Sequence, residues 1–124
     1  MPHTDLADQL FAAFENADAD AVRALCAPDF SGRQNLGPSM NLDNLIRFSL
    51  AVSGVVPDFR YEDRVVTATE SGFVEEHMVC GTLPDGSALR LAACVVAEVQ
   101  DGRIASLREY LDTAAAAGLL KALR

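Results

Sequence analysis

The sequence predicts an α+β fold, with helices in the first half of the chain and an antiparallel sheet in the second. Apolar residues recur every three or four positions in the segments before Pro57, whereas after it they alternate with polar residues. Short turns rich in Gly, Pro and Asp separate the alternating segments, so successive strands are expected to be antiparallel neighbours. A curved sheet wrapped around the N-terminal helices satisfies both patterns.

Three helices are predicted before Pro57, each starting at a residue that can cap a helix N-terminus. The expected capping residues are Thr4, Asp18 and either Asn41 or Asp43. Pro28 ends the second helix and Gly54 the third, since proline disfavours helical geometry before it and glycine suits a helix end. Residues 30–40 contain several turn formers and predict no long element, at most a small hairpin.

Four strands are predicted after Pro57, in segments rich in Val, Phe, Thr and Tyr. Their expected bounds are Phe59–Thr67, Phe73–Gly81, Leu89–Val99 and Ile104–Asp112. The third segment is apolar on both faces except for Arg90. Its outer face is therefore expected either to pack on a second subunit or to lie inside a thick core.

Composition narrows the class of protein. The chain has 124 residues, so one domain over 1–124 is expected. It carries ten Lys and Arg against eighteen Asp and Glu, and its scattered basic residues disfavour nucleic acid and membrane surfaces as partners. Its three cysteines show no CxxC spacing, no basic and apolar leader is visible, and no apolar run is long enough for a membrane span. A cytoplasmic location is expected.

The last strand carries the first candidate site. The Asp101-Gly102 turn sets its start, and counting alternate residues forward gives one face that begins apolar and ends polar. This face comprises Ile104, Ser106, Arg108, Tyr110 and Asp112. A carboxylate at the polar end of an apolar pocket loses solvation and becomes a usable proton carrier near neutral pH, so Asp112 is the first catalytic candidate.

Each residue of this group has a structural alternative. Asp112 could instead cap a tail helix at the surface. Tyr110 could donate a hydrogen bond to a ligand oxygen or fill a pocket wall. Arg108 could orient a substrate, but pairing with a nearby acid such as Glu62 or Glu76 is the favoured interpretation.

The second strand carries a further pair. Glu75 and His77 lie on one of its faces and Glu76 and Met78 on the other, and the sequence does not decide which face points inward. A histidine beside a carboxylate is the usual pair for general acid–base catalysis, so Glu75 and His77 are catalytic candidates. On a solvent face the same residues would have no such role.

No metal or cofactor is expected. The chain has only two histidines, of which His3 is near the N-terminus, and it lacks a Gly-rich phosphate loop or a GxSxG motif. Substrate binding is assigned to Tyr110, Arg108, Phe14, Phe59 and Leu91.

Several short motifs together resemble a known family, the SnoaL-like branch of the nuclear transport factor 2-like (NTF2-like) superfamily. The resemblance covers nearly the whole chain. Its motifs are Asn16-Ala17-Asp18, Ala27-Pro28-Asp29-Phe30, Val56-Pro57-Asp58-Phe59, Gly81-Thr82, Asp101-Gly102-Arg103-Ile104 and Tyr110-Leu111-Asp112.

This resemblance implies a cone-shaped α+β barrel, open at one end, with an apolar interior and commonly a homodimer built on the sheet. The superfamily includes polyketide cyclases, ketosteroid isomerases, limonene epoxide hydrolases and scytalone dehydratase, and also proteins that only bind or scaffold, so fold does not choose among these activities. In the cyclases a pocket Asp in the last strand is the acid/base, and Asp112 matches it best. The epoxide hydrolases have an Arg-x-Asp pair where this chain reads Glu75-Glu76-His77-Met78, and the Tyr and twin-Asp set of the isomerases is not found.

Two functions follow as hypotheses. The first is a protein that holds a small, largely apolar molecule in the cone and acts on it as a cofactor-independent acid–base enzyme of isomerase, cyclase, hydratase or hydrolase type. The alternative is a non-catalytic ligand-binding or dimerisation module. The alternative predicts a small or filled pocket with Glu75 and His77 outside it.

Overall fold

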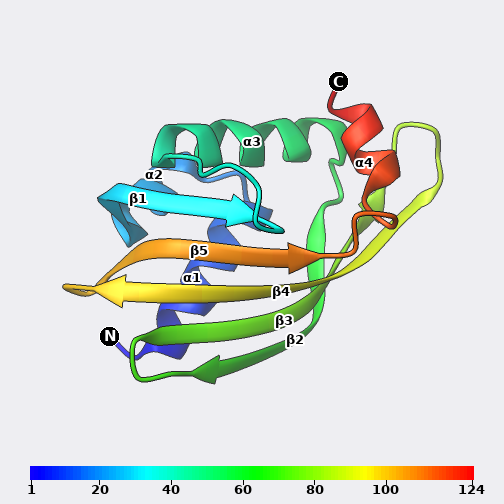
Figure 1. The fold of residues 1–124 in the computed structure, drawn as a ribbon. Helices are drawn as coiled ribbons and strands as arrows, with labels where there is room; N and C mark the ends of the chain where they lie inside the picture. Colours follow the sequence, from blue (N-terminus) through cyan, green and yellow to red (C-terminus); the bar gives the residue numbers. More distant parts are fainter.

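The computed structural model describes residues 1–124 and shows a curved five-stranded sheet with helices packed against its inner face (Figure 1). The helices are α1 (His3–Glu15), α2 (Ala19–Leu25), α3 (Leu42–Val55) and α4 (Ala117–Ala122). The strands are β1 (Cys26–Gln34), β2 (Arg60–Ala68), β3 (Gly72–Thr82), β4 (Ala88–Gln100) and β5 (Arg103–Leu111). None of the helices is long and apolar enough to cross a membrane.

The predicted helix starts are confirmed for α2 and α3. The Asp18 side chain accepts a hydrogen bond from the backbone N–H of Ala21, and the Asn41 side chain accepts one from that of Asn44. Each bond satisfies a donor that the first helical turn leaves free. The first helix differs, because α1 begins at His3 after Pro2 and has no side-chain cap.

All four predicted strands are confirmed, with each end within one residue of its expected position. They form the antiparallel run β5-β4-β3-β2 of the sheet. Short turns between alternating segments were therefore sufficient to predict this part of the topology.

The structure adds a strand that the sequence did not predict. β1 lies at the edge of the sheet and pairs with β5 in the parallel direction. Pro28 and Gly32 within it argue against a strand in the sequence, but an edge strand tolerates both. The small hairpin expected in residues 30–40 is present as an antiparallel bridge between Gly32 and Met40.

A bulge in β5 overturns the predicted face of that strand. Glu98 of β4 pairs with Ser106, whereas the next residue, Val99, pairs with Ile104, so Ala105 is an extra residue. One extra residue moves all following side chains to the opposite face. Ile104 stays buried, but beyond the bulge Leu107 is the buried residue and the Ser106, Arg108, Tyr110 series faces outward.

Two apolar clusters form the core. The larger packs α1 and α2 against the sheet and includes Leu6, Leu10 and Phe73. The smaller joins the end of α3 and α4 to β3 and β4 and includes Val56 and Leu91. Residues of both clusters line one cavity between the helices and the sheet.

Candidate functional site

The cavity inside the curved sheet has a volume of about 300 Å³ and 24 lining residues, of which 17 are hydrophobic. This volume lies at the lower end of the range for small-molecule sites. Three of the five predicted substrate-binding residues, Phe14, Phe59 and Leu91, line it. The aromatic lining as a whole is Phe11, Phe14, Phe30, Phe48, Phe59 and Tyr61.

Glu109 is the acidic residue of the cavity wall, and sequence analysis missed it. It follows the bulge in β5, so it shares the inner face with Leu107 and Leu111. The Gln34 side-chain amide donates a hydrogen bond of 2.7 Å to its Oε1. Burial raises the pKa of Glu109, and the Gln34 hydrogen bond and the charge of His77 offset this only in part. Glu109 therefore holds its proton at higher pH than an ordinary glutamate.

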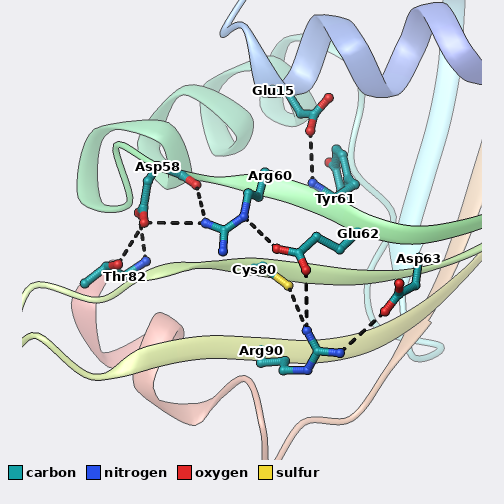
Figure 2. Close-up of polar contacts among 9 residues, drawn as sticks. All are labelled: Glu15, Asp58, Arg60, Tyr61, Glu62, Asp63, Cys80, Thr82 and Arg90. Carbon is teal, nitrogen blue, oxygen red and sulfur yellow. Dashed lines mark hydrogen bonds and ion pairs between the residues drawn. The ribbon is translucent and has the colours of Figure 1, made fainter.

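Tyr61 of β2 also lines the cavity and contributes a phenol. Its ring packs edge-on against Phe11 and Phe59, with centroids 5.1 and 5.0 Å away, and its backbone N–H donates to Glu15 (Figure 2). Burial, and after it the charges of the carboxylates Glu109, Glu15 and Glu75, raise the pKa of Tyr61. Its hydroxyl stays protonated and can donate a hydrogen bond to a ligand.

Glu75 and His77 face inward, which answers the question that the sequence left open. Both side chains are fully buried, and His77 Nδ1 lies 2.6 Å from Glu75 Oε2. Arg64 donates to both oxygens of Glu75, at 2.8 and 3.2 Å, and also contacts Asp8 at 2.8 Å. A carboxylate held by a guanidinium in this way accepts a hydrogen bond from the imidazole Nδ1–H and fixes the orientation of the ring.

A second bulge places Arg64 inside the sheet. Glu62 pairs with Met78 and Val65 with Glu76, so Asp63 and Arg64 together occupy the place opposite His77. Asp63 has a φ of 56°, a left-handed conformation that aspartate tolerates better than most residues. Without the extra residue the side chain at position 64 would point outward, and Glu75 would lose its cation.

His77 lies beside the cavity and does not line it. Its ring centroid is 4.5 Å from that of Tyr61 and 5.0 Å from that of Phe11, and both of these residues are part of the cavity wall. Its Nε2 is buried without a hydrogen-bond partner. His77 and Glu75 therefore act on the cavity through Tyr61 and through the charge of His77 on Glu109.

The expected positions of Asp112, Tyr110 and Arg108 are wrong, because the bulge at Ala105 reverses the faces of β5. Asp112 is exposed, and its Oδ1 accepts hydrogen bonds from the backbone N–H groups of residues 114 and 115, so it caps the turn before α4. Tyr110 is 38% exposed and pairs with Cys94 on the outer face. Arg108 pairs with an acid, as the favoured interpretation held, and that acid is Glu98, at 3.1 Å.

The outer surface of β2, β3 and β4 carries an ionic network (Figure 2). It links the arginines Arg60 and Arg90 to the acids Asp58, Glu62 and Asp63. Both arginine side chains are at least half exposed, and pairs of this kind contribute little to stability. Nowhere do three His, Cys, Asp or Glu side chains gather as a metal-ligand group.

Comparisons with known proteins place this geometry in a family. Comparison with curated protein sequences gives no match. Among solved structures, a proposed polyketide cyclase from Xanthomonas campestris pv. campestris is 24% identical, with a TM-score of 0.81 over 90% of this chain and 91% of its own. An epoxide hydrolase of M. tuberculosis is 20% identical, with a TM-score of 0.76 over 98% and 88% of the two chains.

A third structure, from Catenulispora acidiphila, has a ketosteroid isomerase-like fold and is in complex with trimethylamine. It is 12% identical, with a TM-score of 0.74 over 85% of this chain and 83% of its own. At these identities the three structures establish the α+β, NTF2-like cone and leave the activity open. The family model for the SnoaL-like domain matches residues 7–107. The chain therefore belongs to the SnoaL-like domain family.

Proposed function

We propose that the protein binds a small, largely apolar molecule in its cavity and that Glu109 moves a proton on it. The observation that carries this proposal is a single carboxyl group in a hollow of about 300 Å³ that is lined mainly by hydrophobic residues, six of them aromatic. Burial raises the pKa of Glu109, as general acid–base catalysis near neutral pH requires. The reaction class is a cofactor-independent isomerisation, cyclisation, hydration or hydrolysis.

Each polar group then has a role. Glu109 is the catalytic residue, because its carboxyl is the proton-transferring group that a bound molecule can touch. Tyr61 donates a hydrogen bond from its phenol to a ligand oxygen. Glu75 and His77 are positioning residues, since their buried pair packs behind Tyr61 and His77 acts on Glu109 by charge. A positioned proton carrier is typically worth about 10²- to 10⁴-fold in rate.

The test uses two measurements on one protein preparation. Native mass spectrometry of material purified from its own host shows whether a molecule is retained in the cavity. Deuterium exchange at the carbon next to the carbonyl of 1-tetralone, followed by NMR in D₂O, reports proton transfer on a neutral bicyclic ketone. We expect catalysed exchange that Glu109→Gln lowers by about 10²-fold or more.

Two controls make this test decisive. Glu76→Gln removes the same charge from the exposed outer face of β3 and should leave exchange unchanged. Leu91→Trp fills the cavity with a large side chain and should abolish binding and exchange together. Exchange that survives in Glu109→Gln would remove Glu109 from the mechanism.

The non-catalytic alternative stays open as a second candidate. It predicted a small or filled pocket with Glu75 and His77 outside it, whereas the cavity of about 300 Å³ is not filled and both residues are buried beside it. Binding of 1-tetralone without any catalysed exchange would favour this alternative.

We further propose a homodimer built on the sheet. The outer face exposes Tyr110 at 38%, beside Cys94 of β4, and Val65 at 56%, which pairs with Glu76 of β3. Sedimentation analysis should give twice the chain mass, and Val96→Glu should give the monomer.

The three cysteines are free, which supports a reducing, cytoplasmic location.

A further inference from the structure

The charged groups around the cavity are unbalanced in sign. Glu109 and Arg33 are the charged residues of the lining. Arg33 is exposed and pairs with Arg108 across the parallel strands β1 and β5, so its side chain shares the outer face with that of Arg108. No cationic side chain therefore reaches the interior of the cavity to face Glu109.

The residues behind the wall reinforce this imbalance. The charges of Glu109, Glu15 and Glu75 all act on the Tyr61 phenol, and Arg64 opposes them there. His77 also lies beside Tyr61, but it is bound to the carboxylate of Glu75. The Arg64 guanidinium is already bound to Glu75 and Asp8, which share its single positive charge. The field at the Tyr61 end of the cavity is therefore negative.

We propose that the cavity selects its ligands by charge: it accepts neutral and positively charged apolar molecules and rejects anions of the same shape, and Glu109 sets this selection. This inference rests on the proposed function, because it concerns the molecule that the same cavity binds.

An anion is rejected because it would lose its hydration in the cavity and find no cation there to replace it. An anion that enters an apolar cavity loses its hydration, and here it would also lie beside Glu109, so either the two charges repel or one of them must take up a proton. A neutral molecule avoids both costs. An ammonium group gains Glu109 as a counter-ion and the faces of Phe11, Phe59 and Tyr61 as cation–π partners.

Three probes with the same ring system test the selection at pH 7 by isothermal titration calorimetry. They are 2-acetylnaphthalene, which is neutral, 2-naphthoate, which is an anion, and 2-naphthylmethylammonium, which is a cation. For the unmodified chain we expect 2-naphthoate to bind at least tenfold more weakly than 2-acetylnaphthalene, and the ammonium to bind at least as tightly as the ketone.

The Glu109→Gln variant tests whether this one side chain causes the charge selection. This variant should bring 2-naphthoate to within about threefold of the ketone and weaken the ammonium relative to the ketone. Glu76→Gln is the matched control, since it lowers the net negative charge by the same amount on the outer face. It should leave all three affinities as they were.

Two other results would contradict the proposed charge selection, and a third would contradict the proposed function as well. Equal binding of 2-naphthoate and 2-acetylnaphthalene to the unmodified chain overturns charge selection. A weak anion that gains equally from Glu109→Gln and Glu76→Gln shows an effect of overall charge and removes Glu109 from the selection. Failure of all three probes to bind overturns the proposed function itself, and the charge selection with it.

Discussion

The buried carboxyl of Glu109 predicts a pH dependence of stability that Glu109→Gln should remove. An unfolded glutamate titrates near pH 4.3, and burial in the cavity raises the pKa of Glu109 in the folded chain. Between these two values the folded chain holds a proton that the unfolded chain has released. The free energy of unfolding therefore falls as pH rises through this window, by at most about 1.4 kcal/mol per pH unit, and is constant above it.

The glutamine variant cannot titrate, yet its amide oxygen can still accept the hydrogen bond from Gln34. The difference in unfolding free energy between Glu109→Gln and the unmodified chain should thus increase in favour of the variant from about pH 4.3 upward and then level off. Urea denaturation at half-unit steps from pH 4.5 to 8 measures this difference, with Glu76→Gln as the control. A difference that does not change with pH, or that favours the unmodified chain as pH rises, would refute the buried-carboxyl argument.

Three further predictions concern the site and the sheet. Arg64→Ala leaves the fully buried Glu75 without its cation, so urea denaturation should show a loss of about 3 kcal/mol or more in the free energy of unfolding. Arg90→Ala removes only an exposed ion pair and should lower this free energy by less than about 1 kcal/mol. Equal costs would contradict the burial argument. Gly72→Ala would place a Cβ against the backbone oxygen of Ala97, too close for the two atoms to coexist without a shift of the backbone. Thermal denaturation should therefore show a loss of about 3 kcal/mol or no folded protein at all, and a stable variant would disprove this close approach. Asp112→Ala should lose about 1 kcal/mol as a lost cap and leave the affinity for 2-acetylnaphthalene unchanged, and weaker binding would return Asp112 to the site.

Local patterns in the sequence were sufficient for most of the fold. Alternation predicted β2 to β5, and side-chain chemistry predicted the cap at Asp18 and named Asn41 as one of two candidates for the cap of α3, because both depend on residues close together in the chain. The resemblance to the SnoaL-like family supplied the cone shape, and Phe14, Phe59 and Leu91 were correctly assigned to its cavity. These assignments need only the type of each element and its apolar side.

Two bulges, one in β2 and one in β5, decide which side chains of the site face inward. Counting alternate residues forward from a turn does not reveal them. In β5 a clue was present, since Leu107 and Leu111 share the parity of Glu109, while Arg108 and Tyr110 share the other. In β2 the clue was that Tyr61 and Val66, both inward-facing, lie an odd number of residues apart. Each change of parity marks one extra residue between the two apolar positions.

The sequence by itself determined which segments are helices and strands, because propensity, capping and alternation act over a few neighbouring residues. Only the tertiary structure decided which acids face the cavity, that β1 joins the edge of the sheet, and that Arg64 reaches Glu75. These features depend on how one strand pairs with another far along the chain. In a structure with a period of two, a single inserted residue exchanges the buried and exposed sets, and the pairing partner alone shows where that residue lies.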